Sequence, residues 1–227
     1  MNTGIEVADL NWTWNEKPLV EKNTKIVNQL INNYKNLNLP FWWWVYPGGK
    51  SEKTIEILLN AGFQDREAIA CMAIDVSSRM PLLKQESDEI EISLVRDNRE
   101  LKNWQTVSFA GFEMPQKTSG QYNEFVKSFD VSQNSPQKLF LAYWQGEPVG
   151  TTLLFLHGDT AGIYFVTTLR AYRSRGIALA LVRRAMEYLQ ASTYKYCILQ
   201  SSKEGFNVYL RAGFKEYCHA DVYCLPD

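Results

Sequence analysis

The chain has 227 residues, of which 45% are hydrophobic and 22% are charged, which is ordinary for a globular protein with a sizeable core. Its 24 basic and 25 acidic side chains give a formal net charge of −1. Because nucleic-acid binders concentrate basic charge, we expect no nucleic acid and no membrane surface among the main partners.

Nothing near the N-terminus has the basic and apolar segments of a signal peptide, and no apolar run reaches the ~20 residues of a membrane span. The two histidines, His157 and His219, lie far apart, so neither a histidine triad nor a metal site is predicted. The four scattered cysteines favour reduced thiols over disulfides or zinc: Cys71, Cys197, Cys218 and Cys224. These features predict a cytoplasmic protein without a metal.

The first 80 residues alternate between helix and strand. Helices are expected at residues 20–37 and 51–60, and strands at 41–45 (in the run PFWWWVYP) and 70–76. The stretch from 77 to 91 is polar, charged and carries Pro81, which is typical of a connection. We therefore expect an N-terminal region at 1–80, a linker at 81–89 and a larger domain at 90–227.

The larger domain has a mixed α+β order. Strands are expected at residues 90–95, 139–144, 149–156, 162–169, 194–200 and 222–225. Helices are expected at 99–110, 121–129, from about 176 onward, and at 203–212. The loop at 111–120 contains Pro115 and two glycines.

The most informative segment joins the strand at 162–169 to the helix that begins near Gly176. Residues 173–178 read Arg-Ser-Arg-Gly-Ile-Ala, which has the form [Q/R]-x-x-G-x-[G/A]. Backbone N–H groups in the first turn of a helix attract anions, and Gly176 and Ala178 leave room for a phosphate to approach the main chain. Arg173 and Arg175 add positive charge, so the segment suits a pyrophosphate. In the alternative interpretation Gly176 only eases a turn and both arginines are solvated.

A second segment of interest begins at Ser201 and Ser202 and ends at Gly213–Phe214, with Tyr209 near the end of its helix. A phenol, with a reference pKa of about 10, can donate a proton to a departing thiolate, whose reference pKa is near 8.5. The alternative is a core tyrosine.

With these motifs, residues 90–227 resemble the GNAT acyltransferase superfamily in element order, in the pyrophosphate turn and in the Tyr-x-x-x-Gly-Phe ending. The resemblance implies a mixed, mostly antiparallel sheet flanked by helices, acetyl-CoA as co-substrate, and Tyr209 as the catalytic acid that protonates the CoA sulfur. It implies main-chain contacts to the pantetheine arm from Val166 and Thr168. The cofactor-binding residues that it implies are Val166, Thr168, Arg173, Ser174, Arg175, Gly176, Ile177, Ala178, Leu179 and Ser202.

The chain departs from the family pattern at two points. Ser202 stands where the family often has an asparagine that contacts the cofactor, and the strand at 162–169 lacks the glutamate that acts as base in many members. The base therefore stays unassigned. The family places the loop between the first two helices over the acceptor, which gives the substrate candidates Phe112, Glu113, Met114 and Tyr122. Glu113 could hold an amine or relay its proton, and a solvated loop carboxylate is the alternative.

The N-terminal region is similar to a truncated GNAT-like half, a smaller α/β unit that precedes some catalytic domains. Residues 58–63 (LLNAGF) echo residues 209–214 (YLRAGF), but no phosphate-binding turn is present and Leu58 stands in the place of Tyr209. This half is expected to shape the acceptor pocket or a dimer surface and to do no chemistry.

The resulting hypothesis is acetyl transfer from acetyl-CoA to a primary amine of a small molecule or peptide. A non-catalytic acyl-CoA-binding regulatory module is the alternative, favoured by the missing strand carboxylate and opposed by Tyr209 and the intact turn. Aminoacyl transfer from charged tRNA fits less well with the balanced charge. The acceptor, the acyl length and the existence of a homodimer stay open.

Overall fold

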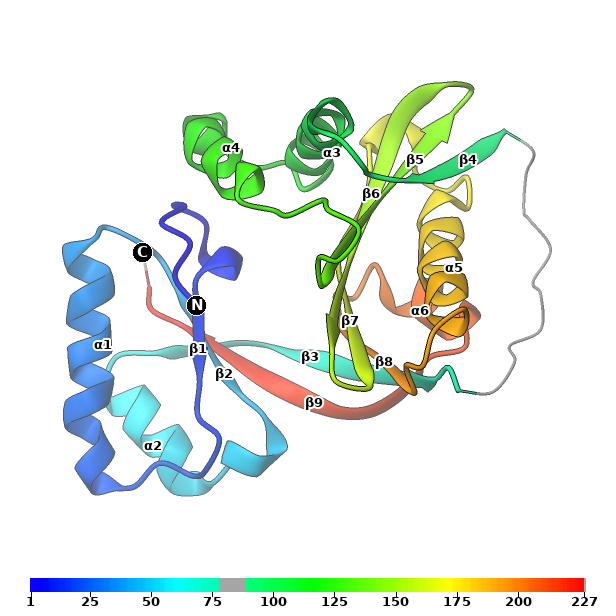
Figure 1. Ribbon diagram of the computed structural model, residues 1–227. Coiled ribbons are helices and arrows are strands. Elements are labelled where there is room, and N and C mark those ends of the chain that lie inside the picture. Colours follow the sequence, from blue (N-terminus) through cyan, green and yellow to red (C-terminus); the bar gives the residue numbers. More distant parts are fainter. Residues whose placement is uncertain (78–88, 227) are drawn as a thin grey trace. The chain divides into compact units, whose positions relative to one another are not determined.

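The computed structural model describes residues 1–77 and 89–226 and divides the chain into two compact units (Figure 1). The first unit comprises Met1–Cys71 and Cys218–Asp227, and the second comprises Met72–Tyr217. The expected linker at 81–89 lies outside the described residues except for Glu89. The units thus divide the chain at other positions than the expected regions, because the C-terminal strand pairs within the first unit.

In the first unit the strand order is β1-β2-β9-β3, with β1 parallel to β2 and β2 antiparallel to β9. Its strands are β1 (Trp12–Trp14), β2 (Trp42–Val45) and parts of β3 (Gln64–Asp75) and β9 (Lys215–Cys224). Its helices are α1 (Thr24–Asn36), α2 (Glu52–Asn60) and the short η1 (Ala8–Leu10), η2 (Glu21–Asn23) and η3 (Pro47–Gly49). The strand β1 was not predicted from the sequence.

The core of the first unit is formed by one stripe of α1 and one face of the sheet. The buried residues Val27, Ile31 and Tyr34 recur at the spacing of a helix face, as burial against a sheet requires. Tyr34 stacks on Phe41 with ring centroids 4.1 Å apart, and the buried Trp43 belongs to the same cluster. The sequence run of aromatic residues before Pro47 is therefore largely a packing feature.

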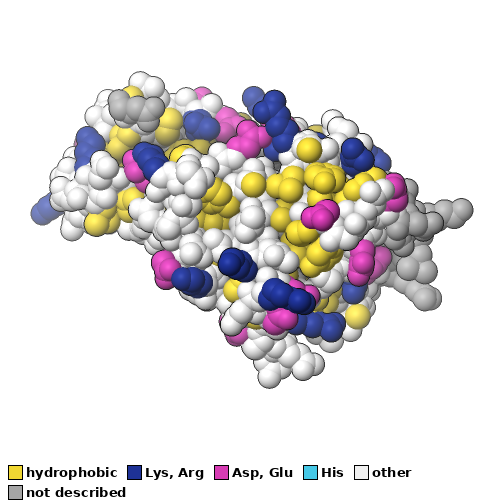
Figure 2. Space-filling view, turned by 90° about the horizontal axis from the view of Figure 1, so that it is seen from above, with side chains coloured by type: hydrophobic (Ala, Val, Ile, Leu, Met, Phe, Trp, Pro, Cys, Tyr) yellow, Lys and Arg dark blue, Asp and Glu magenta, His cyan; other side chains and the backbone are white. Residues whose placement is uncertain are grey.

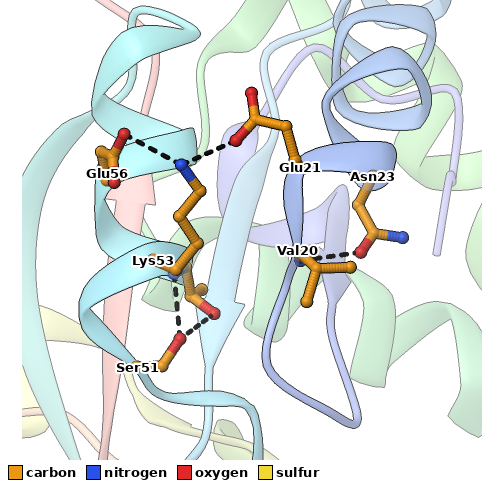
Figure 3. A network of polar contacts seen from close by, with 7 residues as sticks. Val20, Glu21, Asn23, Ser51, Lys53 and Glu56 are labelled. Atoms are coloured by element: carbon orange, nitrogen blue, oxygen red, sulfur yellow. Dashed lines mark hydrogen bonds and ion pairs between the residues drawn. The ribbon is translucent and has the colours of Figure 1, made fainter.

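A small polar network joins η2 to the start of α2 (Figure 3). The Nζ atom of Lys53 lies 2.7 Å from a carboxylate oxygen of Glu21 and 3.0 Å from one of Glu56. The Ser51 Oγ accepts a hydrogen bond of 3.0 Å from the backbone N–H of Thr54, which caps α2. Because the ion pairs are exposed, we expect the cap to contribute more to stability than they do.

In the second unit the strand order is β3-β8-β7-β6-β5-β4, flanked by helices, which confirms the expected α+β architecture. The strands that lie wholly in this unit are β4 (Ile90–Leu94), β5 (Gln137–Trp144), β6 (Glu147–His157), β7 (Thr160–Thr168) and β8 (Tyr196–Ser201). Its helices are α3 (Asn98–Gly111), η4 (Gln116–Thr118), α4 (Ser119–Lys127), η5 (Arg170–Tyr172), α5 (Ile177–Gln190) and α6 (Phe206–Arg211). All pairs from β4 to β7 are antiparallel, and β7 is parallel to β8.

Two glycines let the helices approach the sheet closely. A Cβ atom on Gly150 of β6 would lie 2.9 Å from Ile177 and 3.1 Å from Leu181, both on α5. A Cβ atom on Gly111, at the end of α3, would lie 2.7 Å from the side chain of Thr167 on β7. The first turn of α5 and the last turn of α3 are thus both held at the same end of β6 and β7.

Candidate functional site

The two parallel strands β7 and β8 form a fork. They pair only over their first three residues, and the last paired residues are Gly162 and Ile198. Beyond this point β7 and β8 do not pair with each other, so main-chain groups that point between the two strands have no strand partner there.

A β-bulge shapes the β7 arm of the fork. The register with β6 shifts between Thr151 and Leu153, and Phe165 has a φ of 53°. The Thr151 hydroxyl donates a 2.9 Å hydrogen bond to the carbonyl of Phe165, and the Thr152 hydroxyl donates one of 3.3 Å to the carbonyl of Tyr164. With two carbonyls of the bulge bonded to β6, the distortion is fixed in the fold. Neither threonine was identified from the sequence, since a bulge leaves no pattern of its own.

Aromatic side chains hold the same bulge from the α3 side. The ring of Phe165 lies 5.5 Å from that of Trp104 and 5.9 Å from that of Phe112, with Phe125 and Phe129 at 6.3 and 6.2 Å. Aromatic contacts at these distances stabilise beyond simple burial. The bulge is therefore rigidly placed relative to α3.

The predicted phosphate-binding turn lies directly after β7 and leads into α5. Gly176 is the residue before the helix and has a φ of 81°, and Ser174 has a φ of 63°. The first backbone bond of the helix is donated by Ala180 to the carbonyl of Gly176, at 3.0 Å, so the N–H groups of the preceding residues have no partner inside the helix. The side chains of Ile177 and Leu179 are buried in the core. These two residues can offer only their main chain to a ligand.

Arg173 makes contacts within the protein that were not predicted from the sequence. Its guanidinium donates to the carbonyl oxygens of Thr168, at 3.2 Å, and Gly111, at 3.0 Å, and lies 3.2 Å from a carboxylate oxygen of Glu113. The side chain is thus used to tie the end of β7 to the end of α3. Its charge is partly neutralised by Glu113, and these bonds do not favour the expected contact with a phosphate.

Arg175 lies against aromatic rings instead. Its guanidinium is 4.9 Å from the ring centroid of Trp144 and 5.7 Å from that of Tyr172. Cation–π contacts orient the group without using its N–H donors. Among the described residues no acceptor is found for these donors, so Arg175 is the arginine of this turn that remains able to bind a phosphate.

Tyr209 lies on α6, and its ring is buried against Phe214 with centroids 6.0 Å apart. Burial raises the pKa of the Tyr209 phenol to about 12, because the charged form would be poorly solvated. The hydroxyl makes no hydrogen bond to another described residue. It is therefore protonated at neutral pH and has a proton to donate.

Two other expected residues are engaged within the protein. The Ser202 Oγ accepts a hydrogen bond of 3.2 Å from the backbone N–H of Gly205, which orders the start of α6. Thr168 uses its carbonyl oxygen for Arg173, while its Oγ1 is buried without a partner among the described residues. Val166 is half-buried on the β7 arm of the fork.

The predicted substrate loop is only partly available to a ligand. Phe112 is 40% exposed and Met114 is half-buried, but Glu113 is paired with Arg173. Tyr122 is fully buried, and its hydroxyl donates a 2.8 Å hydrogen bond to the Oγ of Ser108. Tyr122 is buried between α3 and α4, which does not favour its expected place in the acceptor site.

Charged side chains of both signs lie near one another on the face drawn in Figure 2, and hydrophobic side chains gather in patches between them. Among residues 1–77 and 89–226, no three or more His, Cys, Asp or Glu side chains are grouped as metal ligands would be. Within the same residues no helix is both long and apolar enough to cross a bilayer.

The sequence was compared with models of protein families and with curated proteins. Residues 98–214, just over half of the chain, match the family described as "Acetyltransferase (GNAT) family". No protein in a curated collection matches the sequence significantly.

Three solved structures are similar in fold. A GCN5-related N-acetyltransferase from Kribbella flavida shares 12% identity at a TM-score of 0.71, over 98% of this chain and 84% of that chain. A GCN5-related N-acetyltransferase from Sphaerobacter thermophilus shares 18% identity at a TM-score of 0.71. The match covers 88% of this chain and 65% of that chain, just under two thirds of its length. A glucosamine N-acetyltransferase region of a fungal β-N-acetylglucosaminidase shares 12% identity at a TM-score of 0.68, over 97% of this chain and 30% of that chain.

Proposed function

The chain belongs to the GNAT acetyltransferase family, and on that premise we propose that it transfers an acetyl group from acetyl-CoA to a primary amine of a small molecule or peptide. One observation carries the proposal. The fork between β7 and β8 leads directly into a turn whose helix presents unpaired N–H groups beside Gly176, at a φ of 81°.

These features fit the two ends of acetyl-CoA. The pyrophosphate would bind the N–H groups at the start of α5, where the helix dipole favours an anion, with Arg175 adding charge. The pantetheine arm would lie along the β7 arm of the fork and use the main chain near Val166 and Thr168. The buried Ile177 and Leu179 keep the first turn of α5 in place.

In the proposed reaction the lone pair of the amine attacks the thioester carbonyl carbon. An N–H group of the bulge would stabilise the negative charge on the carbonyl oxygen. The C–S bond then breaks, the sulfur takes the proton of the Tyr209 hydroxyl, and an amide is formed. Solvent returns a proton to Tyr209 and accepts the one that the amine loses.

A non-catalytic acyl-CoA-binding module is the second candidate. The observation in its favour is that β7, residues 160–168, carries no carboxylate that could act as a base. The two candidates differ in one measurable respect, the release of free thiol from acetyl-CoA when an amine is added.

The test combines binding and turnover. Calorimetry with acetyl-CoA measures affinity, and a thiol reagent then follows CoA release with a panel of glucosamine, spermidine, phenethylamine and an N-terminal tripeptide. Glucosamine is included because one structural neighbour is described as a glucosamine N-acetyltransferase region. Binding with amine-dependent thiol release supports the enzyme, binding without release supports the module, and no binding refutes both.

We further propose that the first unit is a degenerate GNAT-like half without chemistry. Gly62 and Gly213 end α2 and α6 with φ values of 94° and 97°. In both places the N–H of the next phenylalanine donates a 3.0 Å bond five residues back, to Leu58 in one case and Tyr209 in the other. Leu58 is fully buried and has no proton to donate. The full-length protein should therefore bind one acetyl-CoA per chain in calorimetry, and a stoichiometry of two would contradict this role.

A further inference from the structure

An exposed row of side chains crosses β6, β7 and β8 at the closed end of the fork. Phe155 pairs with Gly162, and Gly162 pairs with Ile198, so the three residues lie side by side on one face of the sheet. Phe155 is 42% and Ile198 36% exposed. The middle of the row has no side chain of its own, and Gly162 is buried.

The ring of Tyr164 occupies the space directly above Gly162. A Cβ atom on Gly162 would be 2.5 Å from Cε2 and 2.6 Å from the hydroxyl oxygen of Tyr164. Tyr164 is two residues further along β7, so the alternation of a strand places it on the same face. Its hydroxyl makes no hydrogen bond to another described residue, and Tyr164 is 41% exposed.

This face is the one that α3 covers in part. Thr167 of β7 faces the end of α3 at Gly111, and its partner on β6 is Thr151, which is an even number of residues from Phe155. α3 therefore covers this face near Thr167 and Thr151, and it does not cover the row around Gly162. A ligand on the row would lie next to the arms between which the thioester is expected.

The residues of β6, β7 and β8 on this face are also uncharged. Strand alternation places on this face Thr151, Leu153, Phe155 and His157 of β6, Thr160, Gly162 and Tyr164 of β7, and Tyr196, Ile198 and Gln200 of β8. None of them is Asp, Glu, Lys or Arg. A polycation would need carboxylates here to offset the loss of its hydration, whereas an apolar ring needs only apolar area.

We propose that Tyr164 contacts the acceptor, with its hydroxyl bonded to the amino group and the row formed by Phe155, Gly162 and Ile198 selecting amines carried on an uncharged, apolar ring. The inference rests on the proposed acetyl transfer and narrows its acceptor class. Burial raises the pKa of Tyr164, and its titratable neighbour Cys197 is likewise kept neutral because burial raises the pKa of its thiol, so the phenol stays protonated. It can then accept a hydrogen bond from the amine without acting as a base.

Two variants disturb the Tyr164 hydroxyl in different ways. Tyr164→Phe removes the oxygen and keeps the ring. Gly162→Ala keeps the oxygen and displaces the ring, and it is compatible with the backbone because Gly162 is not among the glycines with positive φ. Tyr196→Phe is the matched control. Tyr196 pairs with Thr160, at the end of the paired segment that is farthest from the fork.

The probes are phenethylamine, which carries one amine on an apolar ring, and spermidine, a polycation. The wild type should have a kcat/KM at least tenfold higher for phenethylamine. Tyr164→Phe and Gly162→Ala should raise the KM for phenethylamine about tenfold, the size expected for one hydrogen bond made equally in ground and transition states. Their acetyl-CoA Kd and the KM of Tyr196→Phe should not change.

A preference for spermidine, or an unchanged KM in Tyr164→Phe, overturns the inference while leaving acetyl transfer intact. If acetyl-CoA binds but neither amine releases thiol, calorimetry of phenethylamine with the CoA-loaded protein replaces the KM measurement. A tenfold weaker Kd in Tyr164→Phe then supports the contact although turnover failed. An equal Kd, or no binding by the wild type, refutes it.

Discussion

Replacing Gly176 by aspartate or by alanine separates two contributions at the start of α5. Both residues must adopt the φ of 81° that the glycine has, and a left-handed conformation costs a residue with a Cβ about 1–2 kcal/mol. In a chain of this size that cost lowers Tm by roughly 2–8 °C. The two variants should therefore lose similar stability, and only aspartate adds a negative charge.

The added charge determines the expected difference in binding. A carboxylate about 6 Å from a phosphate charge is repelled by about 3 kcal/mol at an effective dielectric constant of 20, before screening by salt. Even half of this weakens binding roughly tenfold. Calorimetry should thus give an acetyl-CoA Kd at least ten times higher for Gly176→Asp than for Gly176→Ala, with the difference shrinking as salt is added. Equal Kd values in two folded variants would refute a phosphate site at this turn.

Four further substitutions test individual residues. Tyr209→Phe should leave the acetyl-CoA Kd unchanged and lower kcat by ~10²-fold or more, as for other general acids; normal turnover would make Tyr209 a core ring. The pKa of Tyr209 is about 12 in the folded protein and near 10 in the unfolded chain, so Tyr209 should stabilise the fold below pH ~10 and lose this contribution as the pH rises toward 12. Chemical denaturation should find a smaller loss of stability over this pH range in Tyr209→Phe. Tyr122→Phe, which deletes the bond to Ser108, should cost about 1 kcal/mol in denaturant unfolding without changing the KM of any acceptor, and an altered KM would return Tyr122 to the site. Arg173→Lys keeps the charge but loses the two carbonyl bonds, so its Tm should fall more than that of Glu113→Gln, which breaks only an exposed ion pair; the reverse order would contradict the role of Arg173 as a tie.

Sequence patterns predicted the fold more completely than the contacts of individual side chains. The spacing of apolar residues predicted every α-helix that the structure describes in the second unit, because the residues buried on one face of a helix recur at a regular interval. The strand β9 begins at Lys215 although the expectation began at 222, since its first residues are polar and exposed and their pairing depends on distant segments.

The directions of the side chains at the site could not be predicted from the sequence, because they also depend on distant segments. Arg173 could face either a phosphate or the end of α3, and only the approach of Gly111 to Thr167 decides between them. The row around Gly162 likewise depends on which residues of β6 and β8 lie beside this glycine. Register across strands is a tertiary property, and a single sequence does not display it.

The strand order of the first unit has a consequence for synthesis on the ribosome. The second unit is one continuous segment, Met72–Tyr217, but the first needs residues from both ends of the chain. Until β9 emerges, the edge of β2 from Trp42 to Val45 lacks the partner that it has in the folded protein. The part that is translated first is therefore completed last, and during elongation it presents a tryptophan-rich strand that a chaperone could bind.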